Sequence, residues 1–120
     1  MAKAATSGGG ATAADALRDA IRTLEVGLAN PRGRGAGVVD LLRERDRVAE
    51  LLPALEQQGV DLRPERTRLE AVDGGMRRRA SAIVKEAGAA GGLAAVRREE
   101  NPPEEAWWWF LDIEVSQKRR

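Results

Sequence analysis

The chain has 120 residues, and its 20 basic and 19 acidic side chains leave a formal net charge of +1. This balance lacks the basic excess typical of proteins whose main task is to bind phosphate backbones, and the absence of Cys excludes disulfides and thiolate metal sites. Because no apolar run approaches the roughly 18 residues that span a bilayer and no secretory signal is evident, we expect one small domain that is not secreted.

The first helix is predicted to follow a disordered tail. Residues 1–11, MAKAATSGGGA, contain a glycine triplet and little that could be buried. Thr12 and Asp15 then form a capping-box signal. Apolar residues follow on one helix face at spacings of 4, 3 and 4: Leu17, Ile21, Leu24 and Leu28. The helix should end near Asn30, because Pro31 disfavours the α conformation in the residue before it.

The second helix is predicted to follow the loop PRGRGAG at 31–37. Its apolar stripe consists of Val38, Leu41, Leu42, Val48, Leu51, Leu52 and Leu55. Arg45 interrupts this stripe. Pro53 lies inside it, so we expect a kink or break near Leu52, and Gly59 should form the C-terminal cap.

A third helix is predicted after a turn at 60–64. Its buried face should consist of Leu69, Val72, Met76, Ala80, Ile83, Val84 and Ala87. Gly74 and Gly75 fall in mid-pattern, where each costs about 1 kcal/mol relative to Ala, so we expect a weak point there. The AGAAGG segment at 87–92 should end this helix, with a short helical turn around Leu93.

The last helix is predicted from the clearest start signal in the chain. Asn101 suits the N-cap, Pro102 the first helical position and Glu104 the third. No segment alternates with period two. We therefore predict an all-α protein, with a helical hairpin or three-helix arrangement over residues 12–100 and a Trp-rich C-terminal helix over residues 101–120.

The chemical inventory argues against an enzyme. The chain has no His, the commonest general base and metal ligand at neutral pH, and no Cys nucleophile. The GRGAG sequence at 33–37 follows no predicted strand, so we interpret it as a loop without phosphate-binding function. We expect no catalytic residue, no cofactor, no metal and no small-molecule substrate.

All aromatic side chains lie in one run, WWWF at residues 107–110. On an α-helical wheel, Trp107, Trp108, Phe110, Leu111 and Val115 share a broad arc. Trp109 and Ile113 form a second stripe on the other side. We expect the broad arc to pack on the protein's own helices and the Trp109–Ile113 stripe to face a protein partner, although the opposite allocation stays open. The predicted function is a non-enzymatic interaction or assembly subunit, with these partner-binding residues: Trp107, Trp108, Trp109, Phe110 and Ile113.

Three other interpretations of the chain stay open. The Trp segment could be a plug for the domain's own core. It could anchor the protein at a membrane surface, since Trp favours that zone and basic residues follow, although many acidic residues surround it. Finally, the arginine faces could bind RNA or the ribosome, with Arg66, Arg77 and Arg78 as phosphate contacts. Surfaces that bind single-stranded nucleic acid usually place aromatic residues among their basic side chains. No aromatic residue lies among these arginines in the sequence.

The stretch NPPEEAWWWFLD, residues 101–112, resembles a tryptophan-rich motif of uncharacterised helical proteins of cyanobacteria and plant plastids. In that motif a Pro-Pro-acidic stretch precedes several Trp residues and then Leu-Asp. The resemblance covers about a dozen residues and implies no activity. It implies a location in the plastid stroma or the cytoplasm.

Overall fold

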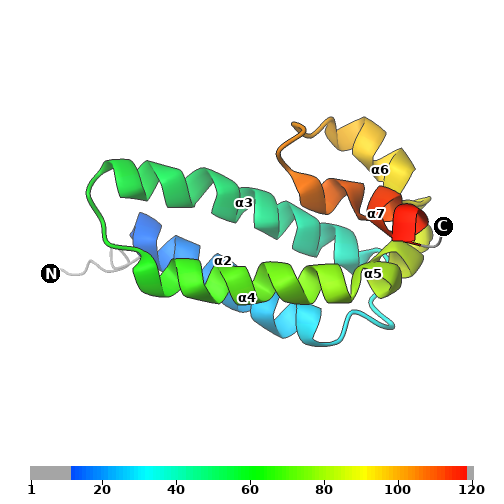
Figure 1. The fold of residues 1–120 in the computed structure, drawn as a ribbon, viewed down its shortest axis with the longest axis horizontal. Helices are drawn as coiled ribbons and strands as arrows, with labels where there is room; N and C mark the ends of the chain where they lie inside the picture. The colour runs from blue at the N-terminus through cyan, green and yellow to red at the C-terminus, as the bar shows by residue number, and fades with distance from the viewer. Residues whose placement is uncertain (1–11, 119–120) are drawn as a thin grey trace, which may run out of the picture.

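The structure is a computed structural model that describes residues 12–118. Every regular element in this part of the chain is a helix, as predicted (Figure 1). The predicted tail, residues 1–11, lies outside it. The α-helices are α2 (Ala13–Ala29), α3 (Gly37–Gln57), α4 (Arg63–Arg78), α5 (Ala80–Glu86), α6 (Leu93–Glu100) and α7 (Leu111–Lys118), and the 3₁₀-helices are η1 (Ala87–Ala90) and η2 (Trp107–Phe110).

The start and end of α2 confirm the predicted signals. The Asp15 N–H donates to Thr12 Oγ1 at 3.1 Å, and the Thr12 N–H donates to Asp15 Oδ2 at 3.3 Å. This reciprocal capping box satisfies amides that have no partner inside the helix. At the other end, Asn30 takes an extended conformation directly before Pro31.

The three long helices form an antiparallel bundle, with α3 running against α2 and α4 (Figure 1). Helix α2 packs along both of the others, whereas the backbones of α3 and α4 approach each other less closely. The apolar faces of all three helices join one hydrophobic core, which continues into the C-terminal segment through Trp108, Trp109 and Leu111. The predicted three-helix arrangement is therefore present, and the Trp segment packs on it.

Of the kink or break predicted near Leu52, the break is wrong, because α3 continues through Pro53. Proline removes one backbone hydrogen bond, but Leu52 and Leu55 on either side of it are buried in the core. Their packing keeps the helix continuous while the proline itself lies exposed. Gly59 adopts the left-handed conformation expected of a C-terminal cap, and its N–H donates to the Glu56 carbonyl.

The third predicted helix is divided in two, but not at the glycines where a weak point was predicted. Helix α4 continues through Gly74 and Gly75, and the helical run is interrupted only at Arg79, between α4 and α5. Gly75 and Met76 are buried, so packing outweighs the low helix propensity of glycine. The interruption at Arg79 lets α5 leave the bundle and pack against α7.

The predicted start of the last helix is also wrong. Asn101 ends α6 in the left-handed conformation, with φ of 48°, instead of beginning a new helix. Asparagine tolerates this region better than most residues. Residues 101–106 form an extended and turning connection, η2 begins at Trp107, and the α-helix begins only at Leu111.

Candidate functional site

The WWWF run forms a 3₁₀-helix, which changes the directions of its side chains from those predicted. Residues in a 3₁₀-helix advance by about 120°, so residues three apart point the same way. Trp107 and Phe110 are therefore on one side and are only half-buried, whereas Trp108 and Trp109 are buried. The predicted outward position of Trp109 is wrong, because its side chain is completely buried. Ile113 does lie outward, with 43% of its surface exposed.

One carboxylate on α3, that of Asp46, accepts a hydrogen bond from each of the two buried indole N–H groups. Trp108 Nε1 and Trp109 Nε1 each donate to Asp46 Oδ1 at 2.8 Å. A carboxylate oxygen has two lone pairs, so a single atom can accept both bonds. A buried indole N–H without an acceptor is costly, so Asp46 makes the inward position of both tryptophans possible.

Three guanidinium groups lie over the faces of three of the four aromatic rings. Arg45 lies 4.3 Å from the Trp108 ring centroid, Arg77 lies 3.9 Å from that of Trp107, and Arg97 lies 5.0 Å from that of Phe110. Cations over aromatic faces are attracted by the electron density of the ring. The three arginines come from α3, α4 and α6, so the aromatic run joins these helices.

All three arginines are held in turn by carboxylates, with Arg77 paired to Glu114 at 3.8 Å. Arg45 is almost fully buried and forms a two-point ion pair with Asp73, at 2.8 and 3.0 Å. Arg97 donates to the Trp109 carbonyl at 2.9 Å and to Asp112 at 2.6 and 3.3 Å. Planar guanidinium groups suit such paired bonds, which orient them firmly. The aromatic run is thus part of a connected polar network.

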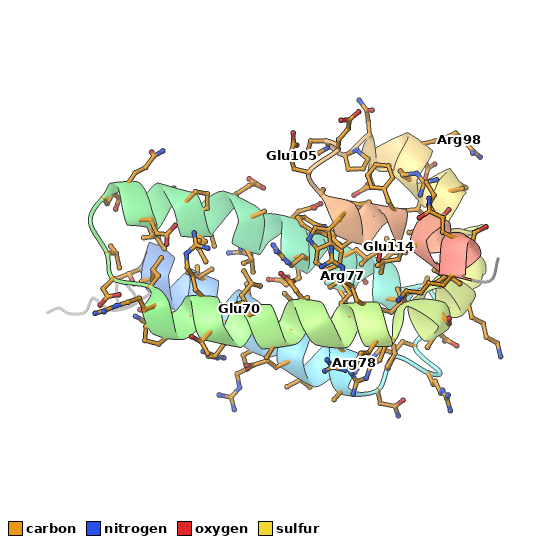
Figure 2. All side chains as sticks on the ribbon, viewed as in Figure 1. Glu70, Arg77, Arg78, Arg98, Glu105 and Glu114 are labelled. Carbon is orange, nitrogen blue, oxygen red and sulfur yellow. The ribbon has the colours of Figure 1, made fainter. Side chains whose placement is uncertain are left out.

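The arginines considered for RNA binding do not share one face. Arg66 forms a two-point ion pair with Glu56, and Arg77 covers Trp107. Figure 2 shows Arg77 on the side of α4 that faces the Trp segment and Arg78 on the opposite side. This arrangement gives no support to a continuous phosphate-binding stripe made by the three.

A groove of about 720 Å³ lies beside the Trp segment, between α3, α4 and residues 100–108. One wall is formed by the exposed turn of α3 around Ala49 and Pro53, and the opposite wall by Pro102, Pro103 and Trp107. Buried aliphatic side chains from α3 and α4 form its floor: Val48, Leu52 and Leu69. The groove therefore combines an apolar floor with a rigid wall of proline and tryptophan.

The unpaired charges at this groove are acidic. Arg45 and Arg66 each hold a carboxylate across the gap between α3 and α4, and Glu100 is bound by an arginine of α3. Glu50 and Glu105 form no ion pair within the described residues, and Glu105 points outward beside the Trp segment (Figure 2). The rim therefore presents negative charge to any occupant.

Most of the side chains that line the groove are apolar or aromatic. The chain contains no His or Cys, and residues 12–118 contain no group of three side chains placed to hold a metal ion. None of the helices in that range has the length and apolar character needed to cross a bilayer. What the groove does offer is a preformed apolar surface with fixed aromatic edges, which suits binding.

Sequence reasoning missed the residues that hold the tryptophans inward, chiefly Asp46 and Arg97. The one signal was Arg45, whose charge interrupts an otherwise apolar stripe. Asp46 lies more than sixty residues before the tryptophans that it binds, and no local pattern connects them. Comparison of the chain with protein-family models, curated proteins and solved structures finds no match, so the resemblance of residues 101–112 to the tryptophan-rich motif stays a prediction.

Proposed function

We propose that this protein is a non-enzymatic interaction or assembly subunit that binds a short helical segment of a protein partner in the groove between α3, α4 and residues 100–108. In this proposal the Trp segment forms a wall of the binding site and is not inserted into the partner. The observation that carries the proposal is the groove itself, with its apolar floor and its wall of Pro102, Pro103 and Trp107.

The rigidity of the tryptophan wall supports a role in binding. Trp108 and Trp109 are locked by Asp46, and stacked arginines hold Trp107 and Trp108 in place. A surface that is already ordered loses little conformational entropy when a partner binds. Tryptophan is also enriched at the centres of protein interfaces, where its large ring excludes water.

The size of the groove favours a helical occupant of modest length. Its α3 wall extends from Arg45 to Pro53, which corresponds to roughly 12 Å at 1.5 Å per residue. Two to three turns of a partner helix would match this length. Because α3 and α4 approach each other less closely than either approaches α2, such a helix would lie opposite α2 and complete a four-helix arrangement.

The charge of the rim supports a basic partner. Within residues 12–118, Glu50 and Glu105 form no ion pair, whereas the arginines that line the groove are neutralised. Complementary charge contributes chiefly to orientation and to the rate of association. We therefore propose a partner helix with an apolar face flanked by Lys or Arg.

Two alanines of α3 allow a matched test. Ala49 lines the groove, whereas Ala54 does not, and both are exposed. Ala49→Arg should obstruct the groove, and Ala54→Arg should introduce the same charge elsewhere, with little effect of either on stability. The probe would be a fluorescent 14-residue amphipathic helical peptide with Leu on one face and Lys on the other, compared with a peptide of the same design carrying Glu.

Fluorescence anisotropy should show the Lys peptide binding to the wild type and to Ala54→Arg, and at least tenfold more weakly to Ala49→Arg. The Glu peptide should bind weakly to all three. Equal affinity of the Lys peptide for the two arginine variants would refute the groove as the binding site. Comparison of proteins cross-linked to the wild type and to each variant in cells would then show whether a natural partner follows the same pattern.

A further inference from the structure

A second cavity lies at the end of the bundle where the α2–α3 loop meets the junction of α4 and α5 (Figure 1). Its volume is about 350 Å³. The polar side chains that line it are Asn30, Arg32, Arg78, Arg79 and Ser81. Three guanidinium-bearing residues from two separate segments therefore meet at one small cavity.

Two of these guanidinium groups also converge over Gly75, which lines an adjoining hollow of about 190 Å³ together with Glu25 and is not part of the cavity wall itself. Arg79 Nη1 lies 3.2 Å, and Arg78 Nη2 3.7 Å, from the position that a Cβ atom on Gly75 would occupy. Arg79 Nη1 also donates to the Gly75 carbonyl at 3.4 Å. The absence of a side chain at Gly75 thus lets two positive groups lie close together against the helix backbone. Like charges at short range repel, so a bound anion would stabilise this placement.

Within the described residues, no carboxylate pairs with these guanidinium groups to balance their positive charge. Arg32, Arg78 and Arg79 form no ion pair there. The carboxylates that line neighbouring hollows with these arginines are already engaged, Asp112 among them through Arg97. Glu25 is bound at two points by an arginine of α4, and Glu86 accepts the Gly35 N–H at 2.6 Å.

We infer that Arg32, Arg78, Arg79 and Ser81 form a binding pocket for a dianionic phosphate group, as found in phosphate monoesters. Guanidinium groups bind phosphate oxygens through paired hydrogen bonds, and the serine hydroxyl adds another donor. The cavity has room for a phosphate and a small attached group. This inference does not rest on the proposed function, because the groove beside the Trp segment shares none of these residues.

A simpler role of these arginines would be to offset the negative ends of α2 and α4, which both end near the cavity. That role would affect stability without any ligand, whereas the inferred pocket predicts ligand-dependent changes. Gly75→Ala separates the two effects. The added methyl group should favour the helix, but it would occupy the space where the guanidinium groups converge.

The test uses the whole chain at constant ionic strength, maintained with sodium chloride. Binding of inorganic phosphate and of glycerol phosphate would be followed by NMR chemical shifts of the backbone amides around Arg79. Binding of the protein to phosphatidylcholine vesicles, with and without phosphatidic acid, would be measured by co-sedimentation. Arg78→Gln and Arg79→Gln remove one guanidinium each, and Arg98→Gln removes the same charge from an exposed position on α6 (Figure 2).

We expect saturable binding of at least one phosphate probe, weakened tenfold or more in Arg78→Gln and Arg79→Gln and several-fold in Gly75→Ala, and unchanged in Arg98→Gln. Binding of the soluble probes would assign a soluble phosphate ligand, and binding of phosphatidic acid vesicles alone would assign a lipid headgroup. Absence of binding in every arm, or equal weakening in Arg98→Gln, would overturn the inference. Ala49→Arg should leave phosphate binding unchanged, so this result is independent of the groove.

Discussion

Trp109 Nε1 donates a hydrogen bond to Asp46 Oδ1 at 2.8 Å, and Trp109 has the largest of the fully buried side chains in the described part of the chain. The bond joins the C-terminal segment to the middle of the bundle. Because Trp108 uses the same oxygen, Asp46 is the point on which the position of the aromatic run depends.

Replacement of Asp46 should therefore destabilise the protein strongly. Asp46→Ala would leave two indole N–H groups without an acceptor, at an expected cost of about 2–4 kcal/mol in the free energy of unfolding. Asp46→Asn keeps one acceptor oxygen and should cost less. Urea denaturation followed by circular dichroism would measure both, and similar stability of Asp46→Ala and wild type would contradict the network.

Trp109 should behave as a core residue. Trp109→Ala is expected to lower the free energy of unfolding by about 3–5 kcal/mol, because it leaves a large cavity. Ile113→Ala, at an exposed position in the next helix, should change it by less than about 1 kcal/mol. In a variant that keeps only Trp109, the emission should be blue-shifted and protected from acrylamide. Red-shifted, quenchable emission would show that the ring faces solvent.

Arg97 should stabilise the packing of α6 on the aromatic run. Its guanidinium bonds the Trp109 carbonyl and Asp112 and lies over Phe110. Arg97→Lys keeps the charge but loses the planar fork, and we expect a cost of about 1–2 kcal/mol. Arg98→Lys is the matched control and should have no effect. Hydrogen exchange of the α6 amides should accelerate in Arg97→Lys only.

Stability should be constant near neutral pH and fall in acid. The Arg68 hydrogen bond holds the pKa of Glu25 below its ordinary value, and the Gly35 N–H does the same for the pKa of Glu86. Carboxyl groups with a lowered folded-state pKa stabilise the protein above their unfolded pKa of about 4, and this stabilisation is lost as the pH falls through the folded pKa.

Since the chain has no His, no side chain with an ordinary pKa titrates between about pH 5.5 and 8. The urea midpoint should therefore be the same at pH 6 and pH 8 and should decrease below about pH 4.5. Glu25→Gln and Glu86→Gln should each reduce that decrease. A marked change in the midpoint between pH 6 and pH 8 would contradict this assignment.

Gly74→Ala should stabilise the protein by up to about 1 kcal/mol, because Gly74 lies within a continuous helix and alanine is the better helix former. Apart from the adjacent residues and the helix's own backbone, an added Cβ would meet Arg78 Nη1 at 3.3 Å, the end of a flexible and exposed side chain that can move aside. Thermal denaturation would measure the gain. A decrease in the melting temperature would show that Arg78 cannot move.

The sequence by itself determined the helical class and most helix positions, because the responsible signals are local. The spacing of Leu17, Ile21 and Leu24 defines the buried face of α2, and the Thr12–Asp15 capping box defines its start. Gly59 ends the second helical segment as expected, through its left-handed conformation. Each of these features depends on residues a few positions apart, so a pattern in the sequence is sufficient to predict it.

Only the tertiary structure decided which way the tryptophans face. The helical wheel placed Trp109 outward because it assumed 100° per residue, whereas the run is a 3₁₀-helix that turns adjacent rings inward to reach Asp46. Likewise, packing of α3 outweighed Pro53, and packing of α4 outweighed Gly75. In each case the free energy of contacts between segments distant in sequence exceeded the local preference, and such contacts become visible only when the chain is folded.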